Sequence, residues 1–383
     1  MNDYKEWLKN RYLTPVKLPK KDEFYAAISE IEHNFTGRMD AWFANTFILE
    51  ASQLLINSIE LFELGYFDCA YYSLREAMEL STTMVYLSDL PENEKKLEDW
   101  KNKNNFPMQS QMINQLKMFG LIVKDMKDKM PDFFKQLYLV NNQINKFVHK
   151  QGEKFLYVSC NHPFAQPSKL EMAVTEFEKY VSQIISILAI MRLAIDPFPI
   201  LLTDEEMYHR VFHGLSEGYS EEFINLYIGQ NNLAAYKTTD IYTSIYNSFI
   251  NNEKRLDCVT DIVMHQYIDV NKLDEIFSQI HLLKHDAVIS VLLISLNDKI
   301  CNIFLSDSFL WYSSNRQSNK KTFPSNSREI AGFIQQSQQY NLEYKGYFIS
   351  KFKIQEKFYL AQHDERLTLE EINYIETTIK NIK

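Results

Sequence analysis

The chain contains little glycine: 9 residues in 383, against 23 Tyr and 26 Phe. Glycine supplies the positive-φ turns and flexible linkers on which short-stranded β proteins depend. Its scarcity argues against a turn-rich β sandwich and favours long helices. Hydrophobic residues make up 45% and charged residues 24%, a composition typical of a globular protein that buries a core. The length corresponds to two or three domains.

Paired cysteines and a positive net charge are also missing. The four cysteines, which form no CxxC pair, are Cys69, Cys160, Cys258 and Cys301. Their spacing excludes a zinc ribbon and a disulfide framework, so we expect four reduced thiols. The net charge of −9 excludes a protein coated in basic surface, although it allows a local basic patch.

Long apolar runs are absent as well. The most apolar window, residues 181–195, is shorter than the roughly 20 residues that span a bilayer, and it carries Gln183 and Arg192. We expect it to form a buried core helix. The first residues, MNDYKEWLKNRYL, contain no apolar segment of a secretory signal. We therefore expect a cytoplasmic protein that does not enter a membrane.

The motifs of several enzyme classes are not found. GxxxxGK[ST], GxGxxG, GxSxG and HExxH are absent, so triphosphate hydrolysis, dinucleotide redox chemistry and serine hydrolysis lack their usual supports. Two HxxxH pairs have the spacing of a zinc pair: His209 with His213, and His281 with His285. With nine histidines in a helical chain such pairs arise by chance. We expect neither a metal site nor a cofactor.

Apolar residues recur at helical spacing near the start of the chain. One helix is predicted from about Arg38 to Leu64. Gly65 interrupts the pattern, and a second helix is predicted to continue to about Leu87. Two long helices joined at a single glycine form an antiparallel hairpin.

Polar side chains and prolines mark further helix starts. In a capping box the first and fourth residues satisfy each other's free amides, and Ser168 with Glu171 and Thr368 with Glu371 fit this pattern. Besides a last helix after Thr368, the predicted helices cover residues 109–118, 131–151 and 168–195.

A double proline and two β-branched segments determine the predicted domains. Pro197 and Pro199 allow neither a helix nor a central strand to continue, so we place a domain boundary between residues 1–199 and 200–383. Residues 286–305 fit either two short strands or a buried helix, and residues 344–362 are ambiguous in the same way. The prediction is a mostly α protein: an N-terminal helical bundle, then a mainly helical C-terminal domain with a small β element.

The stretch from Asn141 to Lys150, NNQINKFVHK, ends one of the predicted helices. Its helix carries an apolar stripe at spacings of three and four, formed by Phe133, Leu137, Val140, Ile144 and Phe147. Asn142, Asn145 and His149 gather on nearly the opposite face, within reach of one another. This polar row therefore faces solvent or a partner and not the core.

A family resemblance follows from these elements. The second helix of the hairpin carries LREAMEL, and about seventy residues later a helix ends in Val148-His149. This arrangement resembles the HEPN superfamily over roughly residues 38–195. HEPN domains are all-helical bundles found in prokaryotic toxins, antiphage defence proteins and CRISPR-associated nucleases. The resemblance implies an RNA- or nucleotide-associated protein and, where it is catalytic, a metal-independent endoribonuclease.

The catalytic motif of the family is matched only in part. Active members resemble one another in an Arg that precedes a His with four to six residues between them. The His corresponds to His149, but the positions for the Arg hold Asn142, Gln143 and Ile144. Lys146 is the nearest preceding cation. This departure weakens the nuclease interpretation more than the fold interpretation, because Arg holds a phosphate bidentately whereas Lys acts as a point charge.

The chemistry of RNA cleavage assigns roles to the candidate residues. His149 would act as general acid or base, and Asn145 and Asn142 would orient it. Lys146 or Arg75 would hold the phosphate. Arg75 lies four residues before Glu79, so it forms either a local ion pair or a contact that reaches His149 from another helix.

A basic region lies near the C-terminus. Residues 311–360 contain more basic than acidic residues, and aromatic residues alternate with the later lysines. This pattern is typical of single-strand binding, although a solvated loop beside a lysine-rich face fits it as well. The candidate RNA-binding residues are Lys320, Lys321, Lys345, Lys351 and Lys353.

Two functions of different classes fit the sequence. The first is an RNA- or nucleotide-associated protein of a bacterial defence or toxin–antitoxin system. The second is a non-catalytic interaction module whose Asn-Asn-His face binds a second subunit. The expected partners are RNA and a second copy of the chain or another protein.

Overall fold

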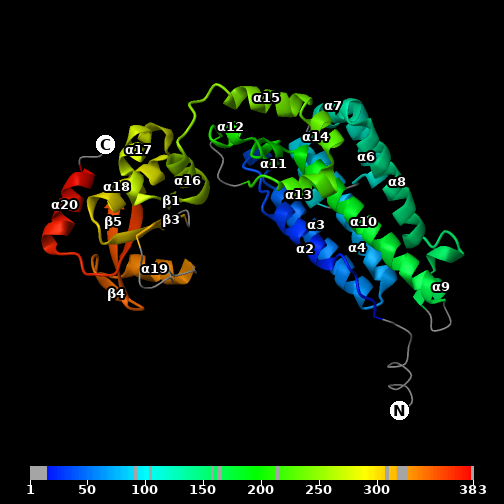
Figure 1. Cartoon of the computed structure of the whole chain (residues 1–383), viewed down its shortest axis with the longest axis horizontal. Helices are drawn as coiled ribbons and strands as arrows, with labels where there is room; N and C mark the ends of the chain where they lie inside the picture. The colour runs from blue at the N-terminus through cyan, green and yellow to red at the C-terminus, as the bar shows by residue number, and fades with distance from the viewer. Residues whose placement is uncertain are drawn as a thin grey trace, which may run out of the picture. The chain divides into compact units, whose positions relative to one another are not determined.

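The computed structural model describes residues 15–89, 93–102, 106–156, 158–161, 166–211, 216–306, 310–316 and 327–380. They belong to two compact units. The first consists of Met1–Tyr208 with Leu215–Asn251, and the second of His209–Gly214 with Asn252–Lys383. Figure 1 shows the elements of each, coloured along the chain.

Helices build the described part of the first unit. Its central helix, α4, packs against α3, α6, α8 and α10. The elements are α2 (Lys21–Glu32), η1 (Met39–Ala41), α3 (Ala44–Glu63), α4 (Phe67–Asp89), α5 (Asn93–Lys101), α6 (Gln109–Phe119), α7 (Leu121–Lys129), α8 (Pro131–Val148), η2 (Glu153–Phe155), α9 (Val158–Asn161), α10 (Pro167–Leu193), α11 (Phe198–Leu201), α12 (Glu205–Tyr208), α13 (Glu221–Phe223), η3 (Ile224–Ile228), α14 (Gln230–Tyr236) and α15 (Asp240–Phe249).

The predicted hairpin is present as α3 and α4, which are joined at Gly65 with a φ of 87°. A column of buried aromatic rings connects it to α10. The ring of Phe62 stacks on that of Phe67 at 4.0 Å and on that of Phe177 at 3.8 Å. Because stacked rings combine a large buried area with a preferred geometry, this column fixes α10 against the hairpin.

The apolar window at residues 181–195 is a core helix, as predicted. It forms the end of α10, where almost every side chain is buried. Its one charged residue, Arg192, is fully buried and donates from Nη2 to both carboxylate oxygens of Asp196 and from Nε to the carbonyl of Asn34. A buried charge is tolerated when it is paired and hydrogen bonded in this way.

The first unit continues past the double proline. The backbone amide of Tyr219 donates to the carbonyl of Pro199 at 2.9 Å, and the hydroxyl of Tyr236 donates to the carbonyl of Leu193 at 2.8 Å. The chain therefore packs back onto α10: residues 209–214 belong to the second unit, but residues 215–251 belong to the first. The boundary that we placed at residue 199 lies inside the unit, because prolines that end a helix do not prevent the next helices from packing on it.

The second unit is built on a mixed sheet. In its described part the strand order is β1-β3-β2-β6-β5-β4, with β1 and β3 parallel and the other neighbours antiparallel. The strands are β1 (Tyr267–Ile268), β2 (Ile300–Leu305), β3 (Trp311–Ser314), β4 (Leu342–Tyr344), β5 (Tyr347–Ile354) and β6 (Lys357–His363). The helices are α16 (Asp257–His265), η4 (Val270–Lys272), α17 (Leu273–Ser278), η5 (Ile280–Leu282), α18 (His285–Leu296), α19 (Ser327–Gln335) and α20 (Leu369–Lys380).

Helices cover both faces of this sheet. Apolar residues of α16, α18 and α20 pack on the face that carries Ile303 and Tyr359. On the opposite face, Phe333 of α19 packs in the cluster that contains Ile349 and Leu360. Alternating side chains of β5 and β6 thus enter two separate cores.

The ambiguous segments have definite structures. Residues 286–305 contain α18 followed by β2, so the helix interpretation holds for the first part and the strand interpretation for the second. Residues 344–362 contain the β5–β6 hairpin. The mostly helical prediction is confirmed, and the small β element is this six-stranded sheet.

Candidate functional site

The helix α8 forms and ends for local reasons. Pro131 occupies its first turn, where a missing N–H costs nothing. Past Val148 the chain leaves the helix: Lys150 has a φ of 52° and Gly152 a φ of 124°. Such left-handed residues are a common way to stop a helix. His149 is therefore the last residue before a sharp change of direction.

His149 is exposed to solvent at this helix end. The neighbouring contacts come from α4: the hydroxyl of Tyr72 donates to the carbonyl of Val148 at 3.3 Å, and Lys150 pairs with Asp68. In the part of the chain that the structure describes, no side chain hydrogen bonds or pairs with the imidazole of His149. The ring is free to meet a ligand.

The predicted Asn-Asn-His row divides in the structure. Asn145 is half-buried, and its Nδ2 donates to Oδ1 of Asn141 at 3.3 Å. Its Oδ1 is buried without a hydrogen-bond partner among the described residues. Asn142 and Lys146 are half-buried, and within the same residues their side chains form no hydrogen bond or ion pair.

Arg75 forms the local ion pair. Its Nη2 lies 3.3 Å from Oε1 of Glu79, while its Nε is buried and has no partner among the described residues. A third residue of α4, Glu76, has its carboxyl pKa raised by burial and then by the nearby Glu79.

The register of α4 against α8 places Arg75 away from His149. The ring of Tyr71 stacks on Phe147 at 3.9 Å, and Tyr72 contacts Val148. Asp68, one turn earlier in α4, pairs with Lys150, which follows Val148, so the two helices run antiparallel. Arg75 lies about one turn, roughly 5.4 Å, beyond Tyr72 and hence near the level of Asn145. The structure shows no contact between Arg75 and His149.

The three candidate RNA-binding lysines that the structure describes lie in different environments. Lys345 lies in the β4–β5 turn with its Nζ 4.9 Å from the ring centre of Tyr344. Lys353 is exposed, 3.9 Å from a carboxylate oxygen of Glu356. Lys351 is only 5% exposed and donates to the carbonyls of residues 334 and 336 at the end of α19. Lys320 and Lys321 lie outside the described residues.

The alternation of lysine and aromatic residues in this region therefore reflects the two faces of a β-strand. Tyr347, Phe352 and Tyr359 are buried in the two cores of the sheet. Lys351 acts as an internal helix cap, and this position is unavailable to RNA. Successive side chains of a strand point to opposite faces, so each lysine and the aromatic residue next to it in the sequence lie on different sides of the sheet.

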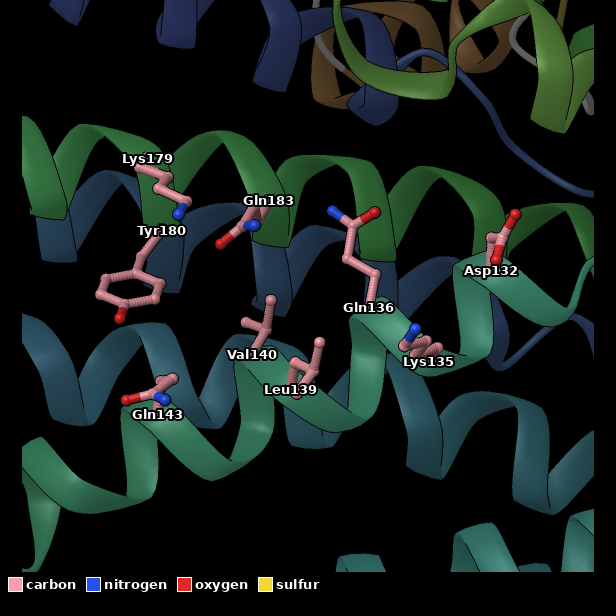
Figure 2. Close-up of a pocket in the computed structure, with 9 residues that line it drawn as sticks. All are labelled: Asp132, Lys135, Gln136, Leu139, Val140, Gln143, Lys179, Tyr180 and Gln183. Atoms are coloured by element: carbon pink, nitrogen blue, oxygen red, sulfur yellow. The ribbon is translucent and has the colours of Figure 1, made fainter.

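A groove lies between α8 and α10, beside the stretch that ends in His149. It has a volume of about 270 Å³, and Figure 2 shows side chains from both helices projecting into it. Val140 and Leu139 form its apolar part. The polar lining residues are Asp132, Lys135, Gln136, Gln143, Lys179, Tyr180 and Gln183.

Neither this groove nor the contact of Tyr72 was predictable from the sequence alone. A partial signal existed for α8, because Gln136 and Gln143 are seven residues apart and so share a helix face. Nothing in the sequence indicated that α10 would lie opposite this face. The contact of Tyr72 likewise depends on the register between two distant helices.

The described residues contain neither a group of metal ligands nor a helix that could span a membrane. Within the described ranges, no three His, Cys, Asp or Glu side chains are grouped as metal ligands, and His281 and His285 lie on different elements. No helix of the described chain has both the length and the apolar character required to cross a membrane. His213 lies outside the described residues.

Comparisons of the chain with protein-family models, with curated proteins and with solved structures gave no match.

Proposed function

We propose that the first unit is a HEPN-like helical domain and that the chain is an RNA- or nucleotide-associated protein of a bacterial defence or toxin-type system. The observation that supports this best is the exposed imidazole of His149 at the end of α8, with Lys146 one turn before it. A histidine titrates near neutral pH, so it can accept and donate a proton under physiological conditions. Lys150 is held by Asp68, and Lys146 is the neighbouring cation left for a phosphate.

The proposed reaction uses these groups in a defined order. Neutral His149 removes the proton of a ribose 2′-hydroxyl, and the 2′-oxygen attacks the adjacent phosphorus. The bond from phosphorus to the 5′-oxygen of the next nucleotide breaks, and that oxygen takes a proton from water. The hydroxide so formed takes the proton back from the His149 imidazolium. The products are a 2′,3′-cyclic phosphate and a 5′-hydroxyl. Lys146 stabilises the charge on the phosphorane, while Arg75 stays paired with Glu79.

Incubation of the purified protein with total RNA at low salt tests this proposal. His149→Ala is expected to lower the cleavage rate by about 100-fold or more, the usual contribution of a general acid–base residue. His33→Ala is the matched control, because His33 is also exposed and also follows the last residue of a helix, α2. Cleavage that is absent from the wild type, or equal in the two variants, would overturn the catalytic role of His149.

A specific observation also favours the second candidate, a protein-interaction module. Large side chains of α4 and α8 are exposed: Tyr72 is 52% exposed, Tyr138 59% and Leu139 50%. Aromatic residues of this kind are enriched at protein interfaces. A molar mass twice that of the chain, reduced to one copy by Tyr138→Glu, together with no cleavage of RNA, would favour this module over the nuclease.

A further inference from the structure

The joint between α6 and α7 exposes a group of large apolar side chains, which we call the apolar corner. Met118 and Phe119 are each 61% exposed, and Leu121 is 81% exposed. Elsewhere among the described residues, no stretch of four has more than one large apolar side chain that is over 60% exposed. Single exposed apolar residues are common on protein surfaces, whereas a contiguous group marks a surface that meets another apolar body.

The register of α6 against α4 explains why this group is not covered. The hydroxyl of Tyr86 donates to Oε1 of Gln115 at 2.8 Å, and Thr83 contacts Met112, so the two helices run in the same direction. The helix α4 ends three residues after Tyr86, whereas Phe119 lies four residues after Gln115. Phe119 is therefore level with the end of α4, where that helix no longer covers it.

The apolar corner projects from the surface and forms no groove. Its shape is fixed by the carboxylate of Asp89, which accepts from the backbone amides of Ile122 and Val123 at 2.8 Å each. Leu121, with four fifths of its area exposed, stands out from the first turn of α7. A partner helix or peptide binds in a groove with apolar walls, whereas a bilayer surface accepts apolar side chains that project.

The charges beside the apolar corner are of one sign. From residue 104 to residue 124 the only charged residues are Lys117 and Lys124, although the chain has a net charge of −9. The next carboxylate, Asp125, pairs with Lys129 at 2.6 Å. Lysines next to apolar side chains extend their ammonium groups toward anionic headgroups while their carbon stems stay in the apolar boundary. The charge of this region therefore complements an anionic lipid surface.

Further apolar side chains lie at the same end of the bundle. Because α3 and α4 form an antiparallel hairpin, the start of α3 lies beside the end of α4. Met39 and Trp42, which come just before α3, are both exposed. Tryptophan favours the boundary between water and lipid, so this end of the bundle has the composition of a surface that meets a membrane.

We propose that the apolar corner inserts into the headgroup region of an anionic lipid bilayer, with Met118, Phe119 and Leu121 toward the acyl chains and Lys117 and Lys124 on the lipid phosphates. Such binding at the surface requires no spanning helix, and the described chain contains none. It is independent of the function proposed above, because it uses neither His149 nor α8.

Cosedimentation of the full chain with lipid vesicles tests the apolar corner. The wild type is expected to sediment with vesicles of phosphatidylcholine and phosphatidylserine in equal parts, and to bind vesicles of phosphatidylcholine alone much more weakly. Phe119→Ser with Leu121→Ser should weaken binding by about tenfold or more, because two large apolar side chains no longer leave water. The matched control is Met172→Ser with Leu226→Ser, which removes two exposed apolar side chains from α10 and η3 and should bind like the wild type.

The lysines provide a second, independent test. Lys117→Gln with Lys124→Gln should weaken binding to the serine-containing vesicles by about tenfold or more and should leave binding to neutral vesicles unchanged. The control is Lys169→Gln with Lys179→Gln, which makes the same change of charge at two exposed lysines of α10. Thermal unfolding checks that every variant is folded. If the serine variant is unstable, the lysine variant decides the test.

Loss of vesicle binding that is confined to the two corner variants supports the proposal. A wild type that does not sediment with the serine-containing vesicles would overturn it, and so would equal losses in the corner and control variants. A molar mass twice that of the chain, reduced by Phe119→Ser with Leu121→Ser in the absence of vesicle binding, would assign the apolar corner to a contact between copies and overturn it as well.

Discussion

His363 is fully buried in the second unit, and both of its ring nitrogens are hydrogen bonded. Its Nδ1 lies 2.7 Å from the carbonyl of Glu365, which can only accept, so Nδ1 carries the proton. Its Nε2 then accepts from the hydroxyl of Ser350 at 2.9 Å, and that hydroxyl oxygen accepts from the amide of Asn341 at 3.0 Å. A proton added at Nε2 would break this chain of bonds.

The stability of the second unit should depend on pH through His363. Burial lowers the pKa of His363 to about 4, against 6.5 in the unfolded chain. The unfolded chain therefore binds the proton more readily, and stability is lost as pH falls from about 6.5 to about 4. The loss amounts to about 3 kcal/mol for the second unit.

Urea unfolding at a series of pH values, followed by hydrogen exchange in β5 and β6, measures this loss. His363→Asn should be less stable at pH 8 but should show a flatter dependence between pH 6.5 and 4. A wild type and variant with the same pH slope would show that another group is responsible.

Residue positions in the candidate site were predictable only where one helix determines them. The helical wheel of α8 predicted that His149 would face away from the core, and it is exposed. The same wheel grouped Asn145 with it, yet Asn145 is half-buried with a buried Oδ1. The helix α8 packs against α4, α7 and α10, and such neighbours from other parts of the chain determine which edge of its polar face is covered. No spacing within the stretch itself contains that information.

At the scale of elements, the joint between α6 and α7 shows how a helix start depends on a distant residue. The carboxylate of Asp89, at the end of α4, accepts from the backbone amides of Ile122 and Val123 at 2.8 Å each. A Cβ at Gly120 would lie 2.5 Å from Oδ2 of Asp89 and 2.7 Å from the carbonyl of Leu116. The glycine is required for space, since its φ of −68° suits any residue.

Gly120→Ala should therefore destabilise the first unit by about 1–3 kcal/mol, because the methyl group displaces the cap and meets backbone. Gly332→Ala is the control of opposite sign: Gly332 lies inside α19 with nothing within 4 Å of an added Cβ, so a gain of up to about 1 kcal/mol is expected. Thermal unfolding of both variants measures the effect. A Gly120→Ala protein as stable as the wild type would contradict the steric argument.

Capping boxes show which element boundaries the sequence can predict. Thr368 and Glu371 form the predicted box before α20: the amide of Thr368 donates to the carboxylate of Glu371, and the amide of Glu371 donates to the hydroxyl of Thr368. The box predicted at Ser168 is wrong, because α10 begins at Pro167 with Gln166 as its N-cap. A proline with a fixed φ starts the helix two residues earlier than the polar pattern indicates, with Gln166 in place of Ser168 as the N-cap.

At the scale of the molecule, the return of the chain to α10 determines where it can be divided. Tyr219 and Tyr236 are buried in the first unit, and both follow the boundary expected from the double proline. A chain that ends at residue 251 should give a monodisperse, cooperatively unfolding bundle. A chain that ends at residue 199 should aggregate or unfold at a lower temperature, because the surface of α10 would be exposed.

Size-exclusion chromatography and thermal unfolding of the two shortened chains test this prediction. Equal stability would show that residues 215–251 contribute little to the bundle.

The path of the chain also has a consequence for synthesis on the ribosome. The polypeptide enters the second unit at His209, returns to the first at Leu215, and leaves it only after Asn251. Domains that are contiguous can fold as soon as they emerge, N-terminal first. Here the packing of the first unit is complete only after α13 to α15 have been synthesised, and His209 and Val211 bond to Arg255, which is synthesised later still. During that interval the surface of α10 that η3 later covers is the part of the nascent chain that a chaperone would meet.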